Sequence, residues 1–199
     1  MRKVIASIDM GSNSLKLVVG EFLRNKLNIL AVSECSSEGI QNGLVTDPEL
    51  VIESLKNVFE KAETMVGLPI KKVIASVPSQ IASFIISEGS TTINNLDGII
   101  RNIDMIRAMQ AASYNQIATE EELASIIPIN FKINNDEVVP NPLDLHAENL
   151  TVKTVLVTVP KSNVNPLIKC IEKIGVEVLD IALTSSGDYA CLKNDTIKN

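Results

Sequence analysis

The residues that point most directly to chemistry lie at positions 9–16, with the sequence DMGSNSLK. An apolar run at residues 4–8 precedes them and is predicted to be a buried strand, so the polar residues form a turn between two strands. Backbone N–H groups in such a turn can converge on an anion, and Gly11 allows close approach because it has no Cβ. Two serine hydroxyls and the ammonium of Lys16 can add further contacts. The pattern is therefore compatible with binding of a phosphate group.

Asp9 restricts the kind of phosphate ligand that fits this turn. Its carboxylate would repel a bare phosphate, so it suits a site in which Mg²⁺ and its waters lie between the two groups. The same turn is also compatible with an ordinary type I′ or bulged hairpin turn that binds nothing. Local sequence leaves both interpretations open.

The elements around the turn are typical of the α/β class, with short Ile-, Val- and Leu-rich strands on either side of a helix. The strands predicted here are residues 4–8, 15–22, 28–34 and 72–77. The first three form an antiparallel meander. The helix is expected to begin with a capping box of Thr46 and Glu49 and to end at Gly67 and Pro69. The fourth strand is expected to run parallel to a neighbour if the helix is a crossover connection.

The middle third of the chain is predicted to be a separate module with the order strand, helix, strand, strand. Its predicted elements are the strand 80–93, the helix 103–117 capped by Asn102, an alternating strand with Ile127, Ile129, Phe131 and Ile133, and the strand 151–159. The alternation predicts that these four apolar side chains share one buried face. Pro128 predicts an edge position or a bulge in that strand. A unit of this length is the size of a small inserted domain.

Composition and charge argue against several classes of function. The 199 residues are 45% hydrophobic and 21% charged, an ordinary globular balance. The net charge of −6 and the absence of a Lys/Arg cluster argue against nucleic-acid binding. No apolar run approaches the roughly 20 residues that span a bilayer, and the start does not look like a signal peptide. A cytoplasmic protein is therefore expected. Three widely spaced cysteines argue against a disulfide framework or a zinc site.

Several segments resemble the family of the bacterial cell-division protein FtsA, a branch of the actin-like ATPase superfamily. The matching segments are Asp9-Met10-Gly11-Ser12 for its first phosphate loop, Ser37-Glu38-Gly39-Ile40 with Gly43 and Asp47 before its first helix, residues 73–77 before its inserted subdomain 1C, and Ile127-Pro128, Asn141-Pro142-Leu143-Asp144 and residues 155–160 within that subdomain. The run at residues 141–144 is the most specific piece, because heat-shock ATPases and sugar kinases lack it. Glu38 departs from the pattern, which usually has Arg there.

The resemblance implies a fold and a domain organisation. The fold would be an α/β, actin-like (ribonuclease H-like) lobe with an inserted small α+β subdomain of the order strand-helix-strand-strand. Residues 1–79 and 161–199 would form subdomain 1A, the first half of the nucleotide-binding fold, and residues 80–160 would form subdomain 1C. The chain would match the N-terminal half of the family, whose second lobe and C-terminal membrane helix would follow Asn199.

For function, the resemblance implies an ATP-binding, filament-forming protein that tethers the FtsZ ring to the inner face of the cell membrane at the division septum. The residues that would contact the phosphates and Mg²⁺ are Asp9, Gly11, Ser12, Asn13, Ser14 and Lys16, with Asp9 acting through a Mg²⁺-bound water. FtsZ would bind the second lobe, and this fragment would not touch the membrane. No catalytic residue is implied, and the full-length protein would be at most a weak ATPase.

Subdomain 1C would provide contacts for self-association into filaments and for later proteins of the divisome. The candidate contact residues are Ile129, Phe131, Asn141, Pro142, Leu143 and Asp144. From the residues alone, Ile129 and Phe131 also fit plain core packing, and the loop fits a solvated turn. Two other functions stay open: a fragment of an actin-fold enzyme, such as a sugar kinase or an exopolyphosphatase, and an actin-like protein of pilus assembly.

Overall fold

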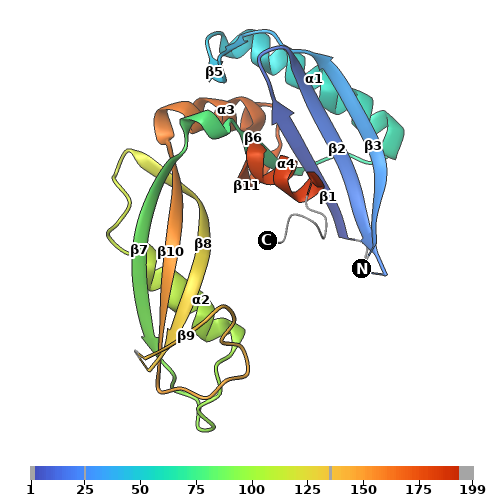
Figure 1. The fold of residues 1–199 in the computed structure, drawn as a ribbon. Coiled ribbons are helices and arrows are strands. Elements are labelled where there is room, and N and C mark those ends of the chain that lie inside the picture. The colour runs from blue at the N-terminus through green and yellow to red at the C-terminus, as the bar shows by residue number, and fades with distance from the viewer. Residues whose placement is uncertain (1–2, 25, 135, 193–199) are drawn as a thin grey trace. The chain divides into compact units, whose positions relative to one another are not determined.

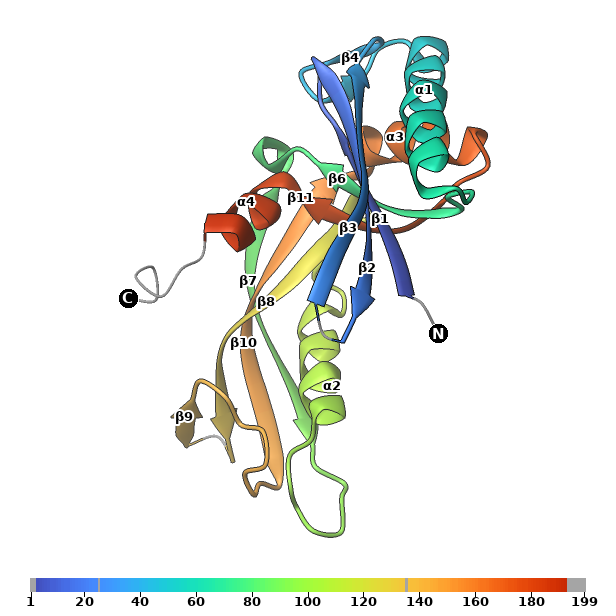
Figure 2. The same ribbon diagram turned by 90° about the vertical axis from the view of Figure 1, so that its right-hand side faces the viewer.

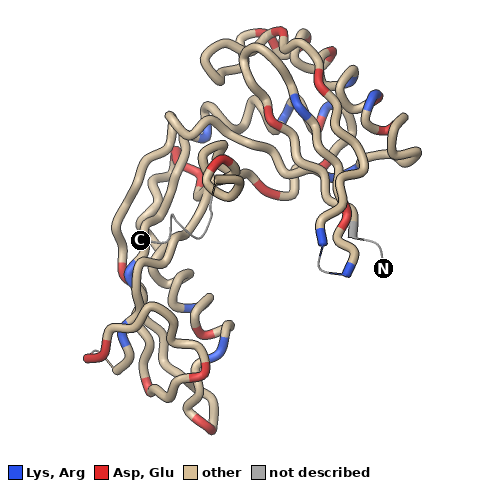
Figure 3. The backbone as a smooth tube through the Cα atoms, turned by 45° about the vertical axis from the view of Figure 1, so that its right-hand side comes forward, with Lys and Arg blue, Asp and Glu red and all other residues tan. Residues whose placement is uncertain are grey.

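The structure, a computed structural model, describes residues 3–24, 26–134 and 136–192. The chain divides into two compact units, each with its own apolar core (Figure 1). Unit 1 combines the segment up to Ile81 with the segment from Lys161 onward, and unit 2 comprises residues 82–160. In both units Lys and Arg residues are interspersed with Asp and Glu residues along the backbone (Figure 3).

Unit 1 is built on a five-stranded sheet with the order β11-β6-β1-β2-β3. Its elements are β1 (Lys3–Met10), β2 (Ser14–Leu23), β3 (Lys26–Ser36), β4 (Ile40–Gln41), β5 (Leu44–Val45), α1 (Pro48–Val66), β6 (Lys72–Val77), the 3₁₀ helix η1 (Ser79–Ile81), α3 (Lys161–Lys173), β11 (Glu177–Leu183) and α4 (Thr184–Leu192). Strands β1, β2 and β3 pair antiparallel, whereas β6 is parallel to both β1 and β11. The predicted meander and the predicted parallel strand after the helix are confirmed.

Helix α1 begins one residue later than the predicted capping box. The Oδ1 atom of Asp47 accepts hydrogen bonds from the backbone N–H groups of Glu49 and Leu50, at 3.0 and 3.3 Å. Thr46 instead closes the preceding loop, because its N–H and its hydroxyl both donate to the carbonyl oxygen of Gly39. The predicted Thr46 cap is therefore wrong, and an Asp at the next position satisfies the first free N–H groups of the helix.

Helices α1 and α3 cover the same face of the sheet (Figure 2). Gly67 ends α1 as predicted, with the left-handed φ of 73° that a C-terminal cap requires. The core of unit 1 takes alternate residues of the first two strands, among them Ile8 and Met10. Because successive side chains of a strand point to opposite faces, Asp9 lies on the face that these two helices leave open.

Unit 2 is an antiparallel sheet with the order β7-β10-β8-β9 and one helix packed on it (Figure 2). Its elements are β7 (Ser83–Thr92), α2 (Asn102–Ser113), β8 (Glu121–Ile133), β9 (Glu137–Val139) and β10 (Asn149–Pro160). The order agrees with the predicted strand, helix, strand and strand, with the short β9 added. The helix ends four residues earlier than predicted, and it is preceded by Arg101 rather than capped by Asn102.

A bulge in β8 divides its apolar residues between two faces. β10 pairs Lys153 with Asn130 and Thr154 with Pro128, so Ile129 has no partner. The bulge that Pro128 predicted is therefore present. Because the extra residue reverses the alternation, Phe131 is buried whereas Ile129 is 48% exposed. The predicted single buried face is wrong for Ile127 and Ile129 and right for Phe131 and Ile133, as their exposed fractions of 49%, 48%, 2% and 5% show.

Helix α2 lies directly on the backbone of β7. A Cβ atom at Gly89 would lie 2.1 Å from the backbone N of Ala112 and 2.3 Å from the backbone O of Ala108. The hydroxyl of Ser87, two residues away on the same face, donates to the carbonyl oxygen of Ala112 at 2.7 Å. Only a residue without a side chain allows this approach.

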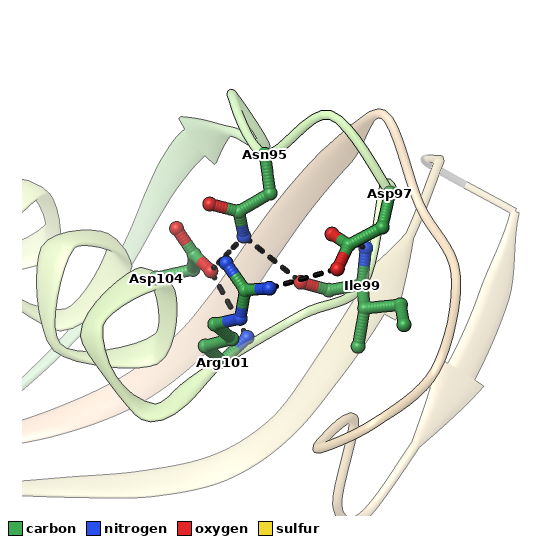
Figure 4. Close-up of polar contacts among 5 residues, drawn as sticks. All are labelled: Asn95, Asp97, Ile99, Arg101 and Asp104. Atoms are coloured by element: carbon green, nitrogen blue, oxygen red, sulfur yellow. Dashed lines mark hydrogen bonds and ion pairs between the residues drawn. The ribbon is translucent and has the colours of Figure 1, made fainter.

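The buried carboxylate of Asp104 fixes the start of α2 (Figure 4). The side chain has no exposed surface, and its Oδ2 accepts from the backbone N–H of Arg101 at 2.9 Å and from Nδ2 of Asn95 at 3.3 Å. Its Oδ1 lies 3.5 Å from Nη1 of Arg107. A second carboxylate in the same loop, that of Asp97, pairs with Arg101 at 2.7 Å but is 43% exposed.

Replacing Gly89 by Ala should destabilise unit 2, since the new methyl group would overlap the α2 backbone, which cannot move aside like a flexible side chain. We expect a loss of about 3 kcal/mol in the free energy of unfolding, the upper end for overpacking. Urea unfolding followed by circular dichroism measures it. Ser83→Ala, at an exposed position of the same strand, is the control and should change little. Equal stability of G89A and wild type would show that α2 does not contact β7 this closely.

Replacing Asp104 by Ala should cost about 2–3 kcal/mol, because two hydrogen-bond donors would lose their acceptor in a buried place. Asp97→Ala breaks the exposed ion pair of the same loop and should cost about 1 kcal/mol or less. The same unfolding experiment compares the two variants. If D97A lost as much free energy of unfolding as D104A, burial of the Asp104 carboxylate would not explain its contribution to stability.

Candidate functional site

Three parallel strands of unit 1 end at one edge of its sheet. β1 ends at Met10, β6 at Val77 and β11 at Leu183, and their registers place these ends next to one another. In open α/β sheets, ligands bind beyond the carboxyl ends of parallel strands, where the connecting loops separate. The turn at residues 11–13, the segment after β6 and the start of α4 therefore lie around the same place.

An open pocket of about 330 Å³ lies at this edge. Its lining residues are Asp9, Met10, Gly11, Ser12, Asn42, Gly43, Ser76, Pro78, Gln80 and Thr184. Asp9 is the single charged residue among them, and the others bring hydroxyl, amide and backbone groups. The pocket thus contains one fixed negative charge surrounded by neutral donors and acceptors.

Two hydrogen bonds orient the polar groups of the pocket. The hydroxyl of Ser76 donates to Oδ1 of Asp9, which fixes the carboxylate and leaves Oδ2 without a partner among the described residues. The hydroxyl oxygen of Ser12 accepts from the backbone N–H of Gly43 at 3.2 Å. Because a hydroxyl has one proton, Ser12 can still donate it into the pocket. An acceptor and a donor are therefore held side by side.

The backbone of the turn offers further donors. The N–H of Gly11 donates to the carbonyl oxygen of Ser14 at 3.1 Å and closes the two-residue loop of Ser12 and Asn13. Within the described residues, the N–H groups of those two loop residues donate to no acceptor. A Cβ atom on Gly11 would lie 3.0 Å from the carbonyl oxygen of Ser14, so the turn is tight there.

Lys16 lies beside the pocket but does not line it. It is the register partner of Asp9 across β1 and β2, so both side chains are on the same face of the sheet. Its ammonium lies 4.0 Å from Oε1 of Glu34 on β3, and its side chain is 55% exposed. Of the predicted phosphate residues, the structure thus brings Asp9, Gly11 and Ser12 into the pocket and leaves Lys16 turned toward Glu34.

The arrangement fits an anion together with a divalent cation better than either alone. A carboxylate oxygen can bind a hydrated cation, and a hydroxyl with two backbone N–H groups can bind a phosphate oxygen. In the described part of the chain, no three His, Cys, Asp or Glu side chains gather to hold a metal. A cation in this pocket would therefore take most of its ligands from water and from the phosphate itself.

Seven lining residues were not predicted from the sequence as phosphate or Mg²⁺ contacts. They are Met10, Asn42, Gly43, Ser76, Pro78, Gln80 and Thr184. The sequence did carry a signal for Ser76 and Pro78, which lie on either side of the last residue of a strand predicted to be parallel. The carboxyl ends of parallel strands are where ligands bind. Asn42 and Gly43 come from a hairpin within a segment that carried no periodic pattern.

The predicted contact residues of unit 2 have different surroundings. Phe131 is 2% exposed in the core of the unit, so its side chain is not available to a partner and that expectation is corrected. Asn141 and Asp144 are exposed, whereas Pro142 is buried. The loop is held to the segment before α2, since the N–H of Asp144 donates to the carbonyl oxygen of Ile100 at 3.1 Å.

A second pocket, of about 440 Å³, lies between β3 and α1 and does not include the turn at residues 11–13. Cys35, Glu38 and Lys61 are among its lining residues. Burial raises the pKa of the Cys35 thiol, and the nearby Lys61 ammonium partly offsets that effect. Glu38 contributes its backbone N–H to the hydroxyl of Ser54 at 3.3 Å.

None of the helices in the described part of the chain has both the length and the apolar character of a membrane-spanning segment.

Sequence comparison finds the SHS2 domain inserted in FtsA at residues 79–158. Cell division protein FtsA of Bacillus subtilis (strain 168) is 28% identical over 195 residues, which cover 97% of this chain and 44% of that protein. FtsA of Staphylococcus epidermidis (strain ATCC 35984) is 30% identical over 176 residues, which cover 88% of this chain and 38% of that protein. The chain spans about two-fifths of the length of these curated relatives, somewhat less than the expected half.

Among solved structures, a chain of the PilM-PilN type IV pilus biogenesis complex has a similar fold. The TM-score is 0.60 at 15% identity, and the match covers 94% of this chain and 49% of that chain. Together with the SHS2 match, this likeness identifies a mixed α/β actin-like lobe with an inserted SHS2 subdomain of antiparallel strands. The predicted fold class is confirmed.

Proposed function

Since this chain is an FtsA-like protein, homologous to the N-terminal two-fifths of FtsA and containing its SHS2 domain, we propose that it supplies the phosphate-binding part of an ATP site used in cell division. The observation that supports the proposal is the pocket at the ends of β1, β6 and β11, where Asp9 and Ser12 present an acceptor and a donor to the same space.

In the proposed complex, Asp9 contacts a water molecule bound to Mg²⁺, and the hydroxyl of Ser12 donates a hydrogen bond to a phosphate oxygen. The backbone N–H groups of Ser12 and Asn13 add two donors, and Gly11 and Ser14 hold the turn in shape. Mg²⁺ supplies the positive charge that the described lining residues lack. Lys16 joins the site when its ammonium leaves Glu34, which lies 4.0 Å away and forms only an exposed, weak ion pair.

The wider proposal concerns the protein to which these residues belong. Such a protein would bind ATP, assemble into filaments and tether the FtsZ ring to the inner face of the membrane, with FtsZ bound by a second lobe. Unit 1 would correspond to subdomain 1A and unit 2 to subdomain 1C. Within unit 2, Ile129 and the exposed loop residues Asn141 and Asp144 are the proposed contacts for neighbouring subunits or later division proteins.

Other functions of the same fold are less well supported. Pilus assembly rests on a likeness of fold at 15% identity, whereas cell division rests on sequence similarity of 28% and 30% along most of the chain. An actin-fold kinase or phosphatase would need a carboxylate that activates a hydroxyl or a water molecule. Asp9 is the single carboxylate among the described lining residues, and the proposal assigns it to the cation.

Binding should depend on Mg²⁺, because Asp9 repels free ATP and attracts the hydrated cation of Mg²⁺·ATP. Nuclear magnetic resonance titration of this chain should show amide shifts at Ser12, Asn13 and Gly43 with Mg²⁺·ATP and none with ATP in EDTA. Asp9→Asn should weaken binding of Mg²⁺·ATP about tenfold, which corresponds to about 1.4 kcal/mol. Asp136→Asn, at an exposed loop position of unit 2, is the charge-matched control and should bind like wild type.

Equal binding of free ATP and Mg²⁺·ATP, or shifts confined to unit 2, would contradict the proposal.

The affinity for Mg²⁺·ATP also tests how much of the site this chain contains. A nucleotide enclosed by two lobes loses many contacts when one is missing, so a protein of full FtsA length should bind at least about tenfold more tightly than this chain. Micromolar affinity in calorimetry of this chain alone would show that the pocket is already complete.

A further inference from the structure

The β4–β5 hairpin brings its tip, Asn42 and Gly43, to the phosphate turn of β1 and β2. Both tip residues have positive φ angles, 50° and 75°, as a type I′ hairpin turn requires. The N–H of Gly43 donates to the hydroxyl oxygen of Ser12 at 3.2 Å. On its other side, a Cβ atom at Gly43 would lie 2.6 Å from Cγ of Pro78. The tip is therefore held between two residues that line the pocket.

The base of the hairpin is fixed independently of the pocket. Ile40 is 3% exposed and belongs to the core of unit 1. The carbonyl oxygen of Gly39 accepts from the N–H groups of Thr46 and Asp47, at 2.8 and 3.2 Å. The hairpin thus has a firm base next to the start of α1. The contacts of its tip with Ser12 and Pro78 are the ones that a ligand in the pocket can affect.

The hydroxyl of Ser12 joins the tip to any phosphate in the pocket. Its oxygen accepts a hydrogen bond from the N–H of Gly43, and its O–H remains available to donate to a ligand. Hydrogen bonds in such a chain polarise one another, so donation to a phosphate oxygen makes the Ser12 oxygen a better acceptor for Gly43. The ligand and the hairpin tip should therefore strengthen each other's contact with the same side chain.

We infer that Gly43 is a positioning residue for phosphate binding, and that it acts through Ser12. This inference rests on the function proposed above. Because coupling between two contacts is reciprocal, a phosphate ligand should hold the hairpin tip more firmly, and a displaced tip should weaken phosphate binding. Asn42, the other residue of the hairpin tip, also lines the pocket and adds a neutral amide donor. The described lining residues include no basic group.

Gly43→Ala tests the inference, with Gly67→Ala as its matched control. Both glycines have nearly the same φ, 75° and 73°, so both variants introduce similar backbone strain. A Cβ atom at Gly67 meets nothing within 4 Å, whereas one at Gly43 overlaps Pro78. In titrations with Mg²⁺·ATP, the dissociation constant of G43A should rise at least about fivefold, and that of G67A should stay within about twofold of wild type. Thermal unfolding of both variants separates binding from loss of fold.

Amide hydrogen exchange of the wild-type chain gives a second measurement that needs no variant. Mg²⁺·ATP should slow exchange of the Gly43 N–H, which donates to Ser12, at least about fivefold. The Gly67 N–H, which donates to the carbonyl oxygen of Glu63 at 2.8 Å, should exchange at the same rate with and without the ligand. A purely structural role of Gly43 would give no such response to ligand.

The outcomes distinguish this inference from the function on which it rests. If wild type binds Mg²⁺·ATP but G43A binds equally well and Gly43 exchange is unchanged, the positioning role is overturned and the proposed function stands. If wild type shows no binding of Mg²⁺·ATP at the phosphate turn, both are overturned together. Slower Gly43 exchange with weaker binding by G43A supports both.

Discussion

The candidate site depends on the parallel alignment of β1, β6 and β11. Because their carboxyl ends reach the same edge of the sheet, residues as far apart in the sequence as Asp9 and Thr184 line one pocket. The hydrogen bond between Ser76 and Asp9 spans two neighbouring parallel strands and holds the carboxylate in one orientation. The turn between β1 and β2 alone would present Asp9 and Ser12, but it would lack the lining residues that β6, the segment after it and the start of α4 supply.

The charge balance of the pocket gives this site its chemical character. A single carboxylate among neutral donors does not attract phosphate by itself, so cation and anion must bind together. The ammonium of Lys16 is turned to Glu34 in an exposed ion pair, and such pairs are weak. In the proposed complex, phosphate recognition would therefore rely on directed hydrogen bonds rather than on a cluster of positive charge.

The sequence predicted the parts of the fold that follow from local pattern. The meander, α1 and the parallel strand β6 could be predicted from hydrophobic periodicity and from the Gly and Pro residues that end the elements. Prediction from residue patterns failed where tertiary contacts determine the local structure. The hydroxyl of Thr46 donates to the carbonyl oxygen of Gly39, and Asp47 caps the helix instead. Pro128 correctly indicated a bulge, but the reversal of faces that placed Ile129 outside required the observed register with β10. The pocket residues on the β4–β5 hairpin could not be predicted, since their role comes from a contact with Ser12 distant in sequence.

The way in which unit 2 begins and ends has an evolutionary consequence. It starts with β7 and finishes with β10, and these strands are neighbours that pair Ser83 with Thr158. Its two ends are therefore adjacent, and the host chain leaves and returns at almost the same point. Joining two points that are already close adds little loop-closure entropy. A module with such ends can be gained, lost or exchanged between related proteins without rearranging the strands of the lobe that carries it.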